Sequence, residues 1–144
     1  MIYTKLTKKA MNIAYEVHKD QMDQSGVPYI FHPIHLAEQM TDEATTITAL
    51  LHDVVEDTDM TFDQLAAMGF PAEVIEALKL LTHDKSVEYM DYVRAIRSNP
   101  IAKAVKLADL AHNRDQSRLD VIDERAAAWE DKYSKAVAIL EGKL

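Results

Sequence analysis

The stretch that decides the fold is ALLHDVVEDT, residues 49–58, which belongs to a run from 41 to 57 without glycine or proline. At roughly 100° per residue, the apolar residues of this run gather on one side of a predicted helix. Four polar residues share the opposite side, where the other residues are Ala49 and threonines: His52, Asp53, Glu56 and Asp57. A helix with this distribution is not an ordinary solvated surface helix. One imidazole and three carboxylates at this spacing could hold a divalent metal ion and place a water beside it.

Helical patterns also account for the rest of the chain. Predicted helices span residues 4–22, 34–40, 42–57, 61–69, 71–81, 86–96, 99–113 and 123–141. The residues expected to cap four of them are Thr41, Thr61, Ser86 and Asn99. No segment alternates apolar and polar residues as a strand would. The sequence therefore predicts an all-α helical bundle, and we expect residues 1–144 to form a single domain, because no repeat or linker divides them.

Composition and charge narrow the function. The chain has 144 residues with 48% hydrophobic residues, which suits one folded domain. The absence of cysteine leaves histidine and carboxylate as the available metal ligands. A net charge of −8 argues against a nucleic-acid polymer or a membrane surface as partner. No apolar run is long enough to span a membrane and the first residues lack a secretory pattern, so we expect a cytoplasmic protein.

Two residues elsewhere in the sequence could complete a metal site. His32 precedes Pro33 at a predicted helix start, and Asp109 lies in VKLADLAHN at the edge of an apolar face. An unpaired acid in that place is costly, so Asp109 needs a partner. Two histidines and two aspartates from three helices would suit Mn²⁺, Fe²⁺ or Zn²⁺ with open positions for water and substrate. The alternative is that Asp109 pairs with a nearby lysine or arginine while His32 only caps its helix.

Glu56 and Asp57 have both a functional and a structural interpretation. At the end of a surface helix, their negative charges would interact unfavourably with the helix dipole. A nearby cation would offset this unfavourable interaction. If a metal is present, they could orient or deprotonate a metal-bound water. A local basic excess lies on and after the Asp109 helix: Lys103, Lys106, Arg114 and Arg118. These residues could receive phosphates, or they could form a solvated basic face. Trp129 is interpreted as a packing anchor, and the remaining histidines as packing or surface residues.

Three motifs together resemble a known family. VPYIFHP (27–33), ALLHDVVEDT (49–58) and VKLADLAHN (105–113) are similar to the hydrolase part of RelA/SpoT proteins and to small alarmone hydrolases, within the HD-domain metal-dependent phosphohydrolases. The similarity covers roughly residues 10–118. It implies an all-helical HD fold that binds Mn²⁺ and removes pyrophosphate from the 3′ position of guanosine tetra- and pentaphosphate. Carried over by position, the resemblance implies His32, His52, Asp53 and Asp109 as metal ligands. It also implies Glu56 and Asp57 as the acid pair, Asn113 at the nucleoside and Lys106 near phosphate.

The sequence departs from this family where the base would be recognised. Asp23 falls about where the family has an arginine that stacks on the base, and Arg114-Asp115-Gln116 also differs from the family pattern. The resemblance therefore predicts a hydrolase of a small phosphorylated nucleotide and leaves the base open. The alternatives are a hydrolase of another phosphate ester, such as an adenine alarmone or a nucleoside monophosphate, and a non-catalytic nucleotide-binding module. The oligomeric state is not predicted.

Overall fold

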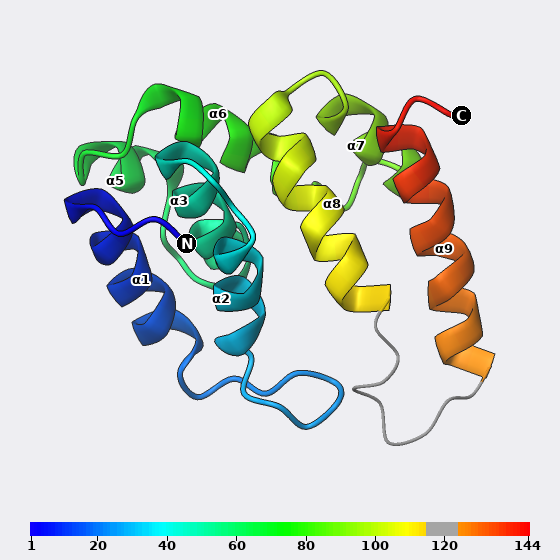
Figure 1. Ribbon diagram of the computed structural model, residues 1–144, viewed down its shortest axis with the longest axis horizontal. Helices are drawn as coiled ribbons and strands as arrows, with labels where there is room; N and C mark the ends of the chain where they lie inside the picture. The colour runs from blue at the N-terminus through cyan, green and yellow to red at the C-terminus, as the bar shows by residue number, and fades with distance from the viewer. Residues whose placement is uncertain (115–123) are drawn as a thin grey trace.

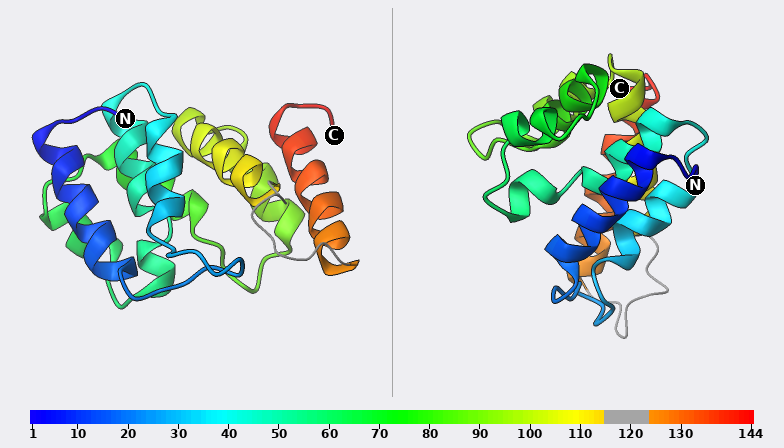
Figure 2. Two further views of the ribbon diagram at one scale, coloured as in Figure 1. Left: turned by 60° about the horizontal axis from the view of Figure 1, so that its bottom comes forward. Right: turned by 90° about the vertical axis from the view of Figure 1, so that its left-hand side faces the viewer.

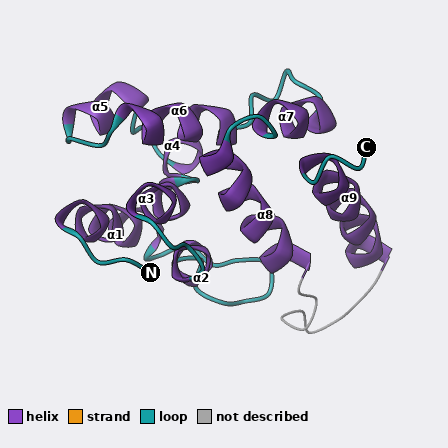
Figure 3. Ribbon diagram, turned by 45° about the horizontal axis from the view of Figure 1, so that its top comes forward, coloured by secondary structure: helices purple, strands orange, loops and turns teal. Residues whose placement is uncertain are grey.

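The computed structural model describes residues 1–114 and 124–144, and in this part of the chain the regular structure is helical (Figure 1). The helices are α1 (Lys5–His18), α2 (Phe31–Glu38), α3 (Glu43–Leu51), α4 (Val54–Asp57), α5 (Phe62–Ala67), α6 (Ala72–Leu81), α7 (Tyr89–Ile96), α8 (Pro100–Arg114) and α9 (Glu124–Leu140). Outside them, the described residues form one isolated bridge, between Met22 and Pro28, and no strand (Figure 3). The predicted all-α fold is confirmed.

The helix at the centre of the bundle is α3. It packs against α1, α2, α6 and α8, and its residues from Thr45 to Leu51 are all buried. The predicted division into an apolar and a polar side is therefore wrong for this helix. Its threonines are accommodated because their hydroxyls bond backbone oxygens: Thr46 Oγ1 donates to the Asp42 carbonyl at 2.6 Å and Thr48 Oγ1 to the Ala44 carbonyl at 2.8 Å.

A break in the chain separates α3 from α4. The sequence predicts one continuous helix over 42–57, but the structure ends α3 at Leu51 and starts a single turn, α4, at Val54. Asp53 has φ −106° and ψ 1°, outside the helical region, which turns the backbone at this point. Glu56 and Asp57 consequently lie in a separate first turn rather than at the end of a long helix. The argument that a cation must offset the dipole at the end of a long helix therefore does not apply to these two acids.

Side-chain caps account for several helix starts. The predicted capping box of Thr61 and Gln64 is confirmed. The predicted cap Asn99 is also confirmed, because its Oδ1 accepts a hydrogen bond from the Ala102 amide at 3.0 Å. Two predicted caps are wrong by a few residues. Asp42 rather than Thr41 caps α3, because its carboxylate accepts from the Thr45 amide at 2.8 Å, and Glu88 rather than Ser86 caps α7.

The α8 helix lies between the N-terminal helices and α9. In Figures 1 and 2 the cluster of α1, α2 and α3 lies on one side of α8, and α9 lies on the other. The α9 helix packs against α7 and α8. The loop between α1 and α2 extends toward the end of α8, so three separate parts of the chain face one another (Figure 2). Among the helices described, none is both long enough and apolar enough to cross a membrane.

Candidate active site

Two histidines and one aspartate meet where α2, α3 and α8 come together. His32 is in the first turn of α2, His52 follows the last residue of α3, and Asp109 is in α8. All three residues are buried, and one ligand atom from each lies within 4.8 Å of the others. The three could therefore hold a metal ion, as the sequence predicts for them.

Hydrogen bonds orient both imidazoles toward this point. His52 Nδ1 is 2.7 Å from the Ala49 carbonyl and donates to it, so Nε2 carries the lone pair. That Nε2 atom is buried and has no hydrogen-bond partner among the described residues. Burial lowers the pKa of His52 to about 4, which keeps the ring neutral. His32 Nδ1 lies 2.6 Å from His112 Nδ1, while its Nε2 is 2.8 Å from Asp109 Oδ1. Because the Asp109 carboxylate can only accept, the Nε2–H of His32 donates to it, and Nδ1 of His32 accepts from the Nδ1–H of His112. A metal bound at His32 Nε2 would take the place of that proton.

Asp53 lies beside the histidine pair. Its Oδ2 is 3.0 Å from His52 Nε2 and accepts a hydrogen bond from the Tyr29 hydroxyl. Burial, followed by the charges of Asp109, Glu56 and Asp57, raises the pKa of Asp53 well above its usual range. A neutral His52 whose lone pair faces carboxylate oxygens of two aspartates needs a proton or a cation between them. The arrangement therefore fits a divalent metal with Asp53 as a fourth ligand.

Asp109 makes contacts in several directions. Its Oδ2 pairs with Lys106 Nζ at 3.0 Å, and its Oδ1 accepts from Asn113 Nδ2 at 3.3 Å. Burial alone would raise the pKa of Asp109, but Lys106 and the hydrogen bond from His32 hold it well below its usual range. The lysine pairing posed as an alternative to a metal site is therefore present. It occupies one carboxylate oxygen and leaves the other directed at the histidines.

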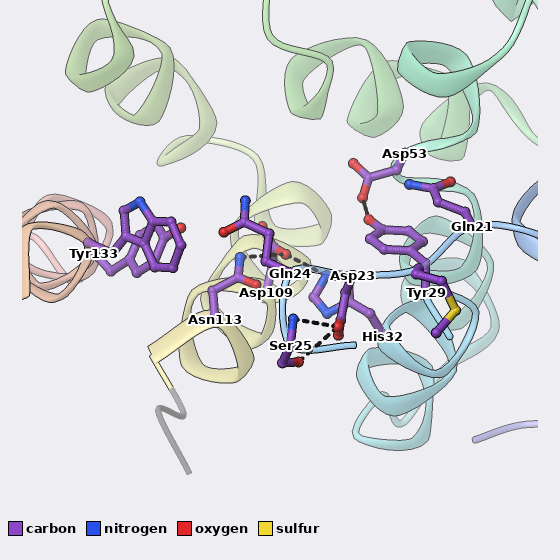
Figure 4. Close-up of a pocket in the computed structure, with 12 residues that line it drawn as sticks. Gln21, Asp23, Gln24, Ser25, Tyr29, His32, Asp53, Asp109, Asn113 and Tyr133 are labelled. Carbon is purple, nitrogen blue, oxygen red and sulfur yellow. Dashed lines mark hydrogen bonds and ion pairs between the residues drawn. The ribbon is translucent and has the colours of Figure 1, made fainter. Parts of the chain in front are cut away.

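A cavity of about 550 Å³ opens next to this cluster (Figure 4). His32, Asp53 and Asp109 form part of its wall. The other residues lining it come from the loop after α1, from α8 and from α9: Gln21, Met22, Asp23, Gln24, Ser25, Tyr29, Asn113, Trp129 and Tyr133. Figure 4 shows Tyr133 across the cavity from Tyr29 and Asp53. The predicted substrate residue Asn113 is thus brought to the metal cluster.

Two aromatic residues of α9 were not expected at the site. From the sequence, Trp129 is interpreted as a packing anchor and the tyrosines at helical spacing as core residues, yet Trp129 and Tyr133 both line the cavity. They are four residues apart and therefore share one helix face. The same spacing is typical of a helix packed on a core, so this signal could not identify a pocket.

The Asp23 side chain forms hydrogen bonds within its own loop. Its Oδ1 accepts from the Ser25 amide and the Ser25 hydroxyl, both at 2.8 Å, and from the Val27 amide at 3.0 Å. These contacts form an Asx turn that shapes one rim of the cavity. The position where an arginine was anticipated thus carries a carboxylate that organises the loop.

The acid pair is divided between two places. Glu56 lines a second cavity of about 180 Å³ together with His52, Asp53 and Lys106, and its Oε1 accepts from the His83 amide at 2.6 Å. Asp57 instead faces the end of α1, where Gln21 Nε2 donates to its Oδ2 at 3.5 Å. Arg118, a predicted phosphate contact, lies outside the described residues.

Lys106 is a buried cation of this second cavity. Burial would lower its pKa, but Asp109 and then the rings of Tyr92 and Tyr89 raise it, so the side chain is charged. Its Nζ lies 5.3 Å from the centre of the Tyr92 ring. Lys106 lies beside the histidine and aspartate cluster with Asp109 as its partner, and its position near phosphate stays a prediction.

Comparisons with known proteins identify relatives of this chain. The family described as HD domain matches residues 10–104. A guanosine-3′,5′-bis(diphosphate) 3′-pyrophosphohydrolase MESH1 from Danio rerio is 35% identical over 96% of this chain and 84% of its own length. The MESH1 protein of Homo sapiens is 41% identical over 76% of this chain and 69% of its own length. The bifunctional (p)ppGpp synthase/hydrolase SpoT of Escherichia coli is 33% identical over 76% of this chain but only 18% of SpoT.

A solved structure shows the same fold. It is described as a metazoan ortholog of SpoT that hydrolyzes ppGpp, and it is 28% identical to this chain with a TM-score of 0.75. The match covers 99% of this chain and 89% of that structure. The chain therefore belongs to the HD-domain family and, within it, to the group that contains the MESH1 and SpoT pyrophosphohydrolases.

Proposed function

We propose that this protein is a metal-dependent hydrolase that removes pyrophosphate from the 3′ position of a ppGpp-like nucleotide, with Mn²⁺ as the bound ion. The relatives named for this activity align over most of the chain. His32, His52, Asp53 and Asp109 are the proposed ligands. A small phosphorylated nucleotide is the proposed partner, in line with the acidic net charge that argues against a polymer.

The observation that carries the proposal is the buried Nε2 atom of His52. It has a lone pair, no hydrogen-bond partner among the described residues, and carboxylate oxygens of Asp53 and Asp109 at 3.0 and 3.8 Å. A structural histidine would have a donor at this atom. In a cluster held together only by ion pairs, a neutral ring would offer the two acids no opposite charge. A cation satisfies all three side chains together.

The residues around the cluster divide the proposed reaction among them. A bound divalent ion supplies a polarised diphosphate and a water of lowered pKa. The water oxygen bonds to the phosphorus attached to the 3′ oxygen, and the bond between that phosphorus and the 3′ oxygen breaks. Pyrophosphate leaves, and the 3′ oxygen becomes a hydroxyl by taking up the proton that the acid pair accepted from the water. Glu56 and Asp57 are the proposed acceptors of the water proton, and Lys106 is proposed to balance negative charge on the diphosphate. Asn113 and the loop at 21–25 hold the nucleoside end.

The base is selected at the far side of the large cavity. Trp129 and Tyr133 offer aromatic faces there, and such faces stack on any base. Asp23 already accepts three hydrogen bonds within its own loop. This observation favours a second candidate substrate, the adenine counterpart of the same nucleotide, because the cation expected to stack on guanine is replaced by an acid.

A product screen tests the proposal. The protein with Mn²⁺ is incubated with guanine and adenine 3′-pyrophosphorylated nucleotides and with nucleoside monophosphates, and the products are separated by chromatography. Release of pyrophosphate that is lost in Glu56→Gln supports the proposed reaction. Orthophosphate released only from monophosphates would contradict it in favour of another phosphate ester. Binding without turnover in either protein would identify a non-catalytic nucleotide-binding module.

A further inference from the structure

His18 is buried although the proposed reaction makes no use of it. It is the last residue of α1, and its side chain has an exposed fraction of 0%. Its Nε2 atom lacks a hydrogen-bond partner among the described residues. Burying an imidazole that is only partly hydrogen-bonded is unfavourable compared with burying an aliphatic side chain. A role that an aliphatic residue could not fill would explain this position.

The other ring nitrogen of His18 leads to Asp57. His18 Nδ1 lies 3.0 Å from Gln21 Oε1, and Gln21 Nε2 donates to Asp57 Oδ2 at 3.5 Å. His18 Nδ1 itself is 3.8 Å from the same Asp57 oxygen. The direction of these bonds is determined by chemistry: a carboxylate can only accept, so the amide nitrogen of Gln21 faces Asp57 and its oxygen faces the Nδ1–H of His18.

The backbone around Gln21 is held on both sides. Its amide donates to the His18 carbonyl at 3.0 Å, and its carbonyl accepts from the Tyr29 amide at 2.8 Å. The rings of His18 and Tyr29 are 4.8 Å apart, and the Tyr29 hydroxyl donates to Asp53. One segment, residues 18–29, therefore contacts both Asp53 and Asp57 through side chains whose own positions are restrained.

We propose that His18 is a positioning residue, which orients the Asp57 carboxylate through the side chain of Gln21. The inference depends on the proposed function in that it takes Asp57 as a proton acceptor. Asp57 has a side-chain exposed fraction of 33% and lies on the single turn α4, so solvent competes for its carboxylate. The contact with Gln21 holds one oxygen, and His18 keeps the Gln21 amide in the orientation that donates.

Kinetics of variants test this role. In His18→Leu the donor to Gln21 is lost, and we expect kcat to fall about tenfold while KM and bound metal stay within about twofold, because only the proton acceptor is displaced. His18→Asn places an amide N–H close to the position of Nδ1–H and should recover most of kcat. In an Asp57→Asn background, His18→Leu should cause no further fall in the residual turnover.

Thr7→Val is the matched control. Thr7 is a buried polar residue of the same helix whose hydroxyl bonds only within the first turn, to Thr4, among the contacts described. We expect it to lower the melting temperature without changing kcat. A fall in kcat equal to that of His18→Leu, or independent effects of His18→Leu and Asp57→Asn in the double variant, would show a general structural role and overturn the inference.

A spectroscopic readout separates this inference from the proposed function. In ¹H–¹⁵N spectra the Gln21 side-chain amide, assigned by its loss in Gln21→Glu, should shift in both His18→Leu and Asp57→Asn but not in Thr7→Val. Failure of the wild-type protein to hydrolyse any nucleotide would contradict the proposed function alone. Gln21 amide signals unmoved by either substitution would contradict the chain of contacts whatever the activity.

Discussion

At the scale of single residues, the site places two aspartates in opposite electrostatic situations. Burial and neighbouring acids raise the pKa of Asp53, whereas Lys106 and His32 outweigh burial and lower that of Asp109. Both carboxylates nonetheless face the neutral ring of His52. Such a group favours a divalent cation over a proton, because the cation can accept lone pairs from all three side chains together.

Asp53→Ala should abolish turnover and lower the metal content of the purified protein. The loss removes a negatively charged ligand but leaves the helices in place, so the far-ultraviolet circular dichroism spectrum should hardly change. Metal content by elemental analysis and turnover in the product screen are the two measurements. Wild-type turnover in this variant would exclude Asp53 as a ligand.

Lys106→Met should destabilise the metal-free protein by about 3 kcal/mol, because it leaves the buried Asp109 carboxylate without its cation. The Lys106 side chain has an exposed fraction of only 12%, so solvent cannot replace it. Urea unfolding with and without Mn²⁺ measures the effect, and bound metal should reduce it. The control is Lys79→Met, which removes an exposed pair with Glu76 and should cost less than about 1 kcal/mol. Equal losses in the two variants would contradict a buried ion pair.

At the scale of elements, the break after α3 and the position of α9 shape the site. Ending α3 at Leu51 lets His52 fold back onto the Ala49 carbonyl and lets Asp53 turn toward Tyr29. The α9 helix closes the opposite wall of the cavity with Trp129 and Tyr133. The metal cluster and the proposed base contacts are thus built by elements far apart in the sequence.

Trp129→Ala should raise KM by about tenfold and change kcat much less, because stacking on a base contributes roughly 1–3 kcal/mol and acts on binding rather than on the reacting phosphorus. Steady-state kinetics on the preferred nucleotide measure both constants. Lys135→Ala, which removes an exposed ion pair with Asp131 on the same helix, is the control and should change neither. A fall in kcat with constant KM in Trp129→Ala would place that residue at the reaction centre instead.

At the scale of the whole molecule, the cluster joins α2, α3 and α8, so the binding of a metal ion there would be coupled to folding. Each of these helices is also packed against the others. A ligand that binds only the folded state stabilises the entire domain rather than one element.

Removal of the metal should therefore lower the melting temperature. At a free Mn²⁺ concentration a hundredfold above the dissociation constant, the stabilisation should reach about 2.7 kcal/mol. Calorimetry of the chelator-treated protein with increasing Mn²⁺ measures it, and His52→Ala should remove the dependence. A melting temperature that rises equally with Mn²⁺ in His52→Ala would show that the stabilising ion binds elsewhere.

The sequence by itself determined the helical class, most helix boundaries, and the membership of His32, His52 and Asp109 in one site. These features follow from periodicity, capping residues and specific motifs, which are local. The cytoplasmic location and the single-domain organisation stay predictions.

Only the tertiary structure decided the features that depend on contacts between distant residues. The expected helix is interrupted at Asp53, and Asp57 faces His18 and Gln21. Lys106 pairs with Asp109, and Trp129 and Tyr133 line a cavity. A pattern along one helix shows which residues share a face. What that face meets is determined by packing among separate elements, which a single-sequence pattern does not contain.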